Sequence, residues 1–293
     1  MTPIRSADEH LSFDSALIAA DLHAHSTVSD GTLAPREVVA RAHAMGVQLF
    51  ALTDHDEVSG LAEAAQAARE LGLRFINGVE ISVTWGGQTI HVVGLGIDPQ
   101  DAKLIHGLAR VRSGRLERAR GMAGGLASIG ITGAFEGALK FAGNHELVSR
   151  THFARWLVEI GRCADTREVF NRYLVDGKPG YMPHAWATLT EAVSWIRGAG
   201  GTAVVAHPGR YRLNATEQWA LMCEFREAGG EAIEVATSNH TADQIRRFTQ
   251  LAREFGFAAS RGSDFHGPGE SHAELGRSPP LPDALLPVWH RFG

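Results

Sequence analysis

The stretch DLHAH, residues 21–25, closes an apolar run that begins at Leu17. A short apolar run of this kind, bounded by polar residues, predicts a buried β-strand over residues 17–22. Side chains two residues apart on a strand point to the same face, so His23 and His25 can converge on one ion. Taken alone, the pair is equally compatible with a surface or capping role.

Other apolar runs also end at, or contain, a residue of a type that can bind a metal ion. These residues are His55, Glu80, His91, His207, Asp264 and His266. Asp30, in a turn-like Ser-Asp-Gly sequence, can fold back to the same place. Nitrogen and oxygen donors without a thiolate favour Mn²⁺, Fe²⁺ or Zn²⁺, and the set is large enough for two or three ions. Asp54 and Asp56 either orient a ligating imidazole or lie in a solvated loop.

Helical patterns separate these apolar runs. Predicted strands cover residues 17–22, 47–52, 74–76, 89–95, 202–206, 232–236 and 257–260. Alternation of strands and helices predicts an α/β fold with a parallel sheet or a (β/α) barrel, and about seven strands favour the closed barrel. In such a barrel the strand ends open at one face, where active sites are built.

A basic helical segment interrupts the alternation. Residues 101–188 show no convincing strand and carry 13 Lys and Arg against 8 Asp and Glu. We therefore divide the chain into a barrel domain, residues 17–99 and 189–293, and a helical insertion, residues 100–188. Residues 1–16 are expected to be a poorly ordered polar leader.

Composition limits the class of protein. The chain has 293 residues, a formal net charge of −5 and two cysteines. No apolar run is long enough for a membrane span, and no secretory signal is apparent, so a cytoplasmic protein is expected. Two cysteines cannot build a disulfide scaffold. The negative net charge disfavours broad non-specific binding of nucleic acid.

Cations of the insertion are candidate phosphate ligands. Arg112, Arg115 and Arg118 recur every three residues, which predicts that they lie near one helical face. A solvated helix face is the alternative interpretation. The Arg150-Thr151 pair and Lys178 lie beside hydroxyl or turn-forming residues and are further candidates. No Walker-type loop or dinucleotide-binding glycine motif is present.

The motifs together resemble the PHP (polymerase and histidinol phosphatase) family of metal-dependent phosphoesterases. In chain order they are DLHAHS, SDG, LTDHD, GVEIS, HVVGLGI, VVAHPG and GSDFHG, over about residues 20–96 and 190–268. Within the insertion, RLERAR, SRTHFAR and GKPGY are similar to the subgroup of 3′,5′-nucleoside bisphosphate phosphatases. That subgroup includes 5′-to-3′ exoribonucleases acting on short RNA and RNA 5′ ends.

The resemblance implies a distorted seven-stranded (β/α) barrel with a trinuclear metal site, Mn²⁺ being favoured. One ion would be held by His23, His25 and Asp264; a second by Glu80, which bridges to the first, with His91 and His207; a third by Asp30, His55 and His266. A metal-bound hydroxide, with no protein nucleophile, would hydrolyse the 3′-phosphate of a nucleoside 3′,5′-bisphosphate. The resemblance also implies that the insertion, residues 100–188, is the substrate-recognition domain, with Arg115, Arg118, Arg150, Thr151 and Lys178 as substrate contacts.

Three alternatives stay open. A histidinol-phosphate-type phosphomonoesterase would use the same metals on a smaller substrate. A metal-dependent amidohydrolase also begins with a His-X-His pair, but no lysine stands at a predicted strand end. A non-catalytic module could bind metal and dock RNA through the basic insertion. Partners are expected to be a small nucleotide or short RNA, with no membrane and no protein partner inferred.

Overall fold

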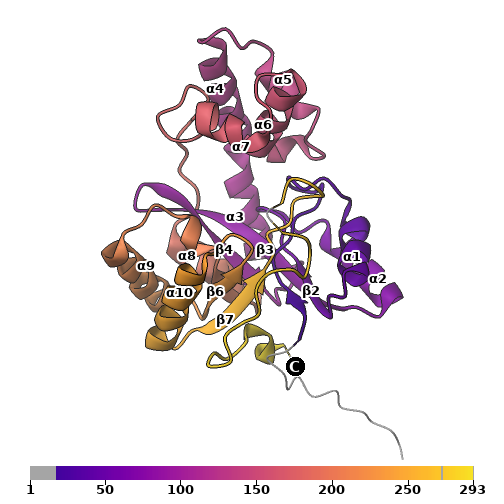
Figure 1. Cartoon of the computed structure of the whole chain (residues 1–293), viewed down its shortest axis with the longest axis vertical. Helices are drawn as coiled ribbons and strands as arrows, with labels where there is room; N and C mark the ends of the chain where they lie inside the picture. Colours follow the sequence, from indigo (N-terminus) through magenta and orange to yellow (C-terminus); the bar gives the residue numbers. More distant parts are fainter. Residues whose placement is uncertain (1–17, 272, 293) are drawn as a thin grey trace, which may run out of the picture.

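Seven strands form one sheet that nearly closes into a barrel in the computed structural model, which describes residues 18–271 and 273–292 (Figure 1). The strands follow chain order: β1 Ala20–Asp21, β2 Leu49–Leu52, β3 Arg74–Trp85, β4 Gln88–Leu95, β5 Thr202–Val205, β6 Ala232–Thr237 and β7 Ala258–Gly262. The predicted α/β class and distorted seven-stranded barrel are thereby confirmed. The predicted leader, residues 1–16, lies outside the described residues.

The sheet is not parallel throughout, as simple alternation would predict. β4 runs antiparallel to both β3 and β5, whereas the other neighbours are parallel. The cause is a two-residue hairpin turn at Gly86 and Gly87, whose φ angles of 56° and 76° are ones that glycine adopts without strain. β3 continues to Trp85, so Glu80 lies within a strand and not after one, as the shorter prediction at residues 74–76 implied.

Backbone hydrogen bonds between the first and last strands bring distant motifs together. The amide of Leu22 donates to the carbonyl of Arg261 at 3.0 Å, just beyond β1 and within β7. Past the strand ends, the amide of Asp264 donates to the carbonyl of His23, and that of His25 to Phe265, both at 2.8 Å. The first and last histidine motifs therefore lie side by side.

Helices cover the outside of the barrel. They are α1 Pro35–Ala44, α2 Leu61–Leu71, α8 Leu189–Gly198, α9 Ala215–Glu227 and α10 Ala242–Phe255. Their ends follow local chemistry: the Thr188 hydroxyl and the Glu191 carboxylate cap α8 reciprocally, and Gly256 ends α10 in the left-handed conformation. No helix among the described residues has the length and apolar character needed to cross a bilayer.

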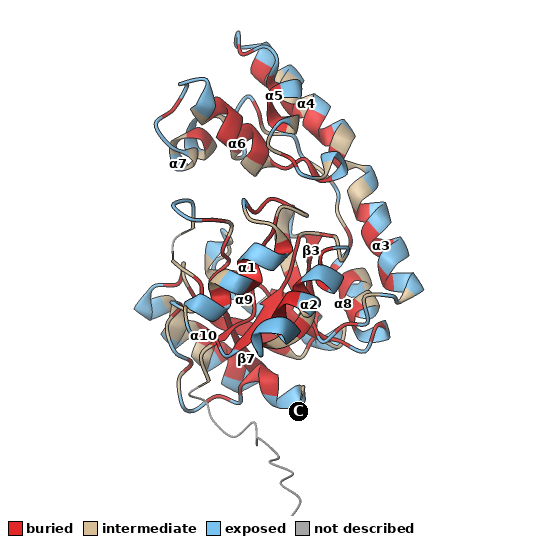
Figure 2. Cartoon of the chain, turned by 90° about the vertical axis from the view of Figure 1, so that its right-hand side faces the viewer, coloured by how far each residue is buried: buried red, intermediate tan, exposed pale blue. Residues whose placement is uncertain are grey.

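A separate layer of helices lies above the barrel (Figures 1 and 2). It contains α4 Arg115–Ala127, α5 Ala134–Leu139, α6 Arg150–Glu159, α7 Thr166–Val169 and a π-helix at Phe170–Leu174. Helix α3 Ala102–Ser113 lies beside the barrel and leads up to this layer. Residues from 119 to 174 share their own apolar core, while Leu104 and Leu108 of α3 join the core of the barrel. The predicted domain limits at residues 100 and 188 stay a prediction.

Candidate metal centre

Glu80 lies at the centre of the histidine cluster. Its side chain is fully buried in the middle of β3. Its Oε2 lies 3.2 Å from the Nε2 atoms of both His23 and His25, and 3.0 Å from Nδ1 of His55. Its Oε1 lies 2.9 Å from Nδ1 of His91. A carboxylate whose two oxygens face imidazoles on different strands is positioned to bridge two cations.

Asp264 completes one potential ligand group. Its Oδ1 lies 3.5 Å from Nε2 of His23 and 3.3 Å from Nε2 of His25. With Glu80, these residues offer four ligand atoms that all lie within 4.8 Å of one another. All four side chains are buried. This group has the composition that the sequence predicted for the first ion and its bridging carboxylate.

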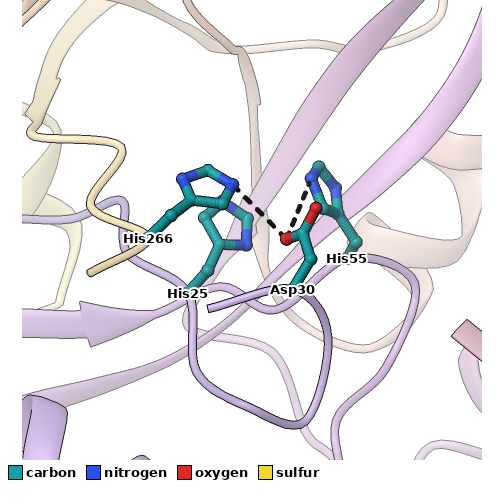
Figure 3. A group of neighbouring side chains, drawn as sticks. All are labelled: His25, Asp30, His55 and His266. Atoms are coloured by element: carbon teal, nitrogen blue, oxygen red, sulfur yellow. Dashed lines mark ion pairs between the residues drawn. The ribbon is translucent and has the colours of Figure 1, made fainter. Parts of the chain in front are cut away.

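Asp30 forms a second group on the other side of His25. Its Oδ1 lies 3.3 Å from Nε2 of His266 and 3.8 Å from Nε2 of His55 (Figure 3). His25 also reaches this group, which the sequence prediction assigned to Asp30, His55 and His266 alone. The turn carrying Asp30 thus brings its carboxylate back to the strand ends.

Glu80, His91 and His207 form a third group of neighbouring side chains. Nε2 of His207 lies 2.9 Å from Oε1 of Glu80 and 3.4 Å from Nδ1 of His91. Ligand atoms of His55, Glu80 and His91 also lie within 4.8 Å of one another. All nine residues that the sequence singled out therefore lie in one cluster. Their division among individual ions stays a prediction.

Buried ligand atoms without hydrogen bonds indicate that the cluster suits cations. Five such atoms belong to His23 (Nε2), His25 (Nε2), Asp30 (Oδ1), His55 (Nδ1) and Glu80 (Oε2). Buried polar atoms are nearly always satisfied, so a concentration of unsatisfied lone pairs at one point calls for a ligand. Imidazole and carboxylate donors without sulfur fit divalent Mn, Fe or Zn.

The carboxylates keep the charge that a cation requires. Burial by itself raises the pKa of Asp264, but Arg210 and His266 together hold it well below its usual range. In the same way, burial raises the pKa of Asp30 while His266 and His55 bring it well below the usual value. Metal ligands must be deprotonated, and both groups meet that condition.

Three non-glycine residues at this end of the barrel have a positive φ: Asp56 (51°), His207 (28°) and Asp264 (54°). They are the non-glycine residues with this property in the described parts of the chain. Such conformations cost about 1–3 kcal/mol each and persist where surrounding contacts enforce them. The strain is therefore concentrated in the loops that carry the cluster.

Asp54 and Asp56 hold those loops and are not solvated. Both are buried. Asp54 accepts hydrogen bonds from the Ser26 amide at 2.8 Å and the Ser29 hydroxyl at 2.6 Å, and that hydroxyl lies 3.5 Å from Nδ1 of His25. Asp56 accepts from the amide of Ser82 at 2.7 Å. The carboxylates thus fix the backbone on either side of the ligands.

Glu234 is a functional residue that sequence reasoning missed. Its Oε1 lies 2.8 Å from Nδ1 of His23, and its Oε2 accepts from the amide of His207 at 2.5 Å. The carboxylate therefore fixes the orientation of His23, whose Nε2 then faces the cluster. The available signal was a lone carboxylate inside the apolar strand β6.

We expect Glu234→Gln to lower the affinity for divalent metal by about 10- to 100-fold, because the His23 imidazole loses its charged orienting partner. Competition with a chelating dye measures this affinity. Glu231→Gln is the matched control, since Glu231 pairs with Arg291 on the surface beside the same strand. Equal affinities in both variants and the wild type would show that Glu234 has no such role.

A cavity of about 390 Å³ opens beside the cluster and carries cations on its far wall. Its lining includes Arg115, Arg118, Arg150 and Thr151, four of the five predicted substrate contacts. Lys178 is exposed in a turn and does not belong to this lining. Its predicted role stays a prediction, as do the roles of the other four.

Arg115 and Arg118 pack against the same aromatic ring. Their guanidinium carbons lie 4.8 Å and 5.4 Å from the ring centre of Trp186. Arg115 pairs with Asp56, whereas Nε of Arg118 donates to the carbonyl of Met182 at 3.0 Å. Burial, with the neighbouring Arg150 and Arg115 charges, lowers the pKa of Arg118 to about 9. An anion in the cavity would relieve this repulsion.

The predicted common face for the three arginines stays a prediction. They lie on two consecutive helices, α3 and α4, which meet at Gly114, where an added Cβ would lie 2.2 Å from the ring of His184. Nη1 of Arg112 donates to the Asp56 carbonyl at 2.6 Å, and Arg115 pairs with the carboxylate of the same residue. Arg115 and Arg118, beyond Gly114, face the cavity.

Two further residues of the cavity wall, Arg210 and Tyr211, were not predicted from the sequence. Arg210 pairs with Asp264. The Tyr211 hydroxyl donates to the carbonyl of Ala206 at 2.8 Å and accepts from the amide of His91 at 2.9 Å. The pair follows His207 on a short helical turn, so a cation and a hydroxyl adjoin the metal ligands.

The insertion also forms hydrogen bonds with the loop that carries Asp30. The hydroxyl of Ser149 donates to Oδ2 of Asp30 at 3.1 Å, and Nη2 of Arg155 donates to the Asp30 carbonyl at 2.7 Å. Arg155 is itself held by Glu270 of the barrel, at 2.7 Å. Helix α6 and its N-cap therefore connect the insertion to Asp30, one of the potential metal ligands.

Comparison with known proteins agrees with this geometry. A 3′,5′-nucleoside bisphosphate phosphatase from Chromobacterium violaceum is 52% identical over 272 residues, which are 93% of this chain and 95% of that protein. The 5′-3′ exoribonuclease Rnm from Escherichia coli is 42% identical over 271 residues, 92% of each chain. A solved structure described as an amidohydrolase from C. violaceum, with bound sulfate and no metal, superposes with a TM-score of 0.91, at 52% identity over 93% of this chain and 95% of that one.

The family model for the PHP domain matches residues 21–174, a segment that begins at β1 and ends in the insertion. It spans more than half of the chain and contains six of the nine clustered residues, from His23 to His91. Together with relatives aligned over nearly their whole length, this match establishes that the chain belongs to the PHP domain family.

Proposed function

We propose that this chain hydrolyses the 3′-phosphate of nucleoside 3′,5′-bisphosphates, such as adenosine 3′,5′-bisphosphate, to a nucleoside 5′-monophosphate and phosphate. The same chemistry extends to short RNA and RNA 5′ ends as a 5′-to-3′ exoribonuclease. The observation that carries the proposal is the cavity beside the cluster, where Arg115, Arg118 and Arg150 face the metal ligands. Two anion-binding places in one cavity suit a substrate with two phosphates.

Similar proteins support this choice of substrate. The C. violaceum relative is named as a phosphatase for these bisphosphates, and the E. coli relative as an exoribonuclease. The cavity volume, about 390 Å³, lies in the range of small-molecule sites. Trp186 and Phe170 in its lining offer aromatic faces for a base, and stacking of this kind tolerates every base.

We propose two or three divalent ions, with Mn²⁺ favoured over Fe²⁺ and Zn²⁺. Their ligands would be His23, His25, Asp30, His55, Glu80, His91, His207, Asp264 and His266. Ions bound there supply a water of lowered pKa and neutralise charge that develops on the phosphoryl oxygens. Phosphoryl transfer of this kind depends on positioning and electrostatics, so no side chain is needed as a nucleophile.

The chain's own residues orient the substrate in this scheme. Arg118 and Arg150 bind the 5′-phosphate, and the ribose spans the distance from there to the cluster. Arg210, at the edge of the cluster beside Asp264, faces the oxygens of the 3′-phosphate. A 3′-nucleotide without a 5′-phosphate would lose the arginine contacts.

A substrate panel tests the proposal. Phosphate release is measured with Mn²⁺ from adenosine 3′,5′-bisphosphate, 3′-AMP, 5′-AMP, histidinol phosphate and a short 5′-phosphorylated RNA. We expect the bisphosphate to be hydrolysed fastest and chelation with EDTA to stop turnover, which added Mn²⁺ restores. Turnover of histidinol phosphate alone would overturn the role of the arginines. No turnover with metal shown to be bound would support a binding module instead.

A further inference from the structure

A second cavity, of about 680 Å³, adjoins the metal centre on the side away from the buried arginines. The two cavities share five lining residues: Thr151, Phe170, Arg210, Asp264 and His266. One wall of the second cavity comes from α7 and the π-helix of the insertion, including Arg167 and Asn171. The opposite wall comes from barrel loops after β6 and β7. The metal centre therefore opens in two directions.

The proposed bisphosphate substrate accounts for the first cavity alone. Its 5′-phosphate and base occupy the space between Arg118, Arg150 and Trp186, and its 3′-phosphate ends at the cluster. Nothing extends beyond that terminal phosphate. The second cavity is larger than the first and reaches Asp264 and His266. The bisphosphate substrate leaves it empty.

In RNA the phosphate at the cluster is a diester, and its second ester oxygen leads to the next nucleoside. Hydrolysis adds water to phosphorus and breaks the bond to the upstream 3′-oxygen. That oxygen takes up the proton, and the phosphate stays on the 5′-oxygen of the downstream strand. The downstream strand must therefore leave the cluster by a route other than the first cavity.

The lining of the second cavity suits a ribose and its phosphate. Its two carboxylates apart from Asp264 are already engaged: Glu270 is held by Arg155 at 2.7 Å, and Asp165 accepts from the amide of Glu168 at 2.8 Å. Arg167 is exposed, and across residues 18–271 and 273–292 no ion pair of its guanidinium is found. The buried Oδ1 of Asn239 has no hydrogen-bond partner and can accept from a ribose hydroxyl.

We propose that this second cavity binds the nucleotide directly downstream of the scissile phosphate of a single-stranded RNA, with Phe170 as a stacking face at the junction and Arg167 near the next phosphate. The inference rests on the proposed function and adds the place where the released strand is held. It assigns the two cavities to the two sides of one phosphodiester bond. Bisphosphate nucleotides use the first cavity, and RNA uses both.

Two variants test the assignment. Asn171→Trp places a bulky ring in the second cavity from an exposed position, and Arg167→Ala removes its cation. Arg172→Ala is the matched control, because Arg172 is exposed on the same segment, pairs with Glu168 at 2.9 Å and lines neither cavity. Turnover of adenosine 3′,5′-bisphosphate and of a 5′-phosphorylated single-stranded RNA of five nucleotides is measured with Mn²⁺.

We expect Asn171→Trp to lower kcat/KM for the RNA by about tenfold or more while the bisphosphate changes by less than about twofold. Arg167→Ala should raise KM for the RNA by about three- to tenfold, more at low salt than at high salt. The control should match the wild type on both substrates.

Three results would overturn the assignment. One is wild-type protein that hydrolyses the bisphosphate and leaves the RNA intact; the second is Asn171→Trp acting equally on both substrates; the third is no effect of either variant. In all three the phosphatase function survives. Loss of turnover on both substrates by wild-type protein with metal bound would instead refute the proposed function, and the inference with it.

Discussion

Replacing His25 or Asp264 with alanine should reduce kcat for adenosine 3′,5′-bisphosphate by at least about a thousandfold. His25 belongs to two of the potential ligand groups, and Asp264, which follows β7, faces both His23 and His25. Loss of either side chain removes a ligand from the centre that neutralises the phosphoryl charge. The effect should appear in kcat, because it concerns the reacting phosphorus and not the binding of the 5′-phosphate.

Metal content gives an independent measurement of the same change. Protein purified with Mn²⁺ should contain less metal per chain in both variants than in the wild type, as determined by elemental analysis. His43→Ala is the control, since His43 is exposed on α1 and away from the cluster. Thermal melts check that all variants fold. Full turnover in both ligand variants would contradict the assignment of the centre.

The second large loss of activity is expected from substitutions of Arg118 and Arg150 in the wall of the first cavity. Arg118→Ala and Arg150→Ala should each lower kcat/KM for the bisphosphate by about 10- to 100-fold, since a hydrogen bond to a charged group contributes about 1.5–3 kcal/mol. The loss should appear mainly as a higher KM. Hydrolysis of 3′-AMP, which has no 5′-phosphate, should change little. The ratio of kcat/KM values for the two substrates is therefore the quantity to measure.

Arg120→Ala provides the matched control for this experiment. Arg120 is exposed on the same helix as Arg118, packs over Phe135 and lies outside the cavity lining. Equal losses on the bisphosphate and on 3′-AMP would indicate that the arginines maintain the structure and do not select the 5′-phosphate. Thermal melts of the three variants check that each of them folds.

The positions of the clustered residues were predictable because their signal is local. A strand alternates its faces, so the spacing of His23 and His25 indicates convergence without further information. The strand ends of a barrel meet at one face, which places His55 and His207 with them. The set of ligands for each ion is harder to predict from the sequence, because it depends on where the side chains point. His25, for example, lies near both Glu80 and Asp30.

Other features depend on contacts between residues far apart in the sequence. Glu234 orients His23 across 211 residues, and Arg155 holds the Asp30 loop across 125. The hydrophobic periodicity of the sequence contains no information on such long-range pairs. The antiparallel β4 was missed for a local reason, since the turn at Gly86-Gly87 redirects the chain in a way that hydrophobic patterning does not encode.

Product analysis of adenosine 3′,5′-bisphosphate by ³¹P NMR, recorded after turnover with Mn²⁺ and purified protein and after removal of the Mn²⁺ by a chelator, shows which phosphate is released. We propose that the 3′-phosphate lies at the metal cluster and the 5′-phosphate at Arg118 and Arg150. We therefore expect the 3′-phosphate resonance to disappear, inorganic phosphate to appear, and 5′-AMP to be the nucleotide product. Formation of 3′-AMP, or an unchanged spectrum with metal shown to be bound, would contradict the proposal.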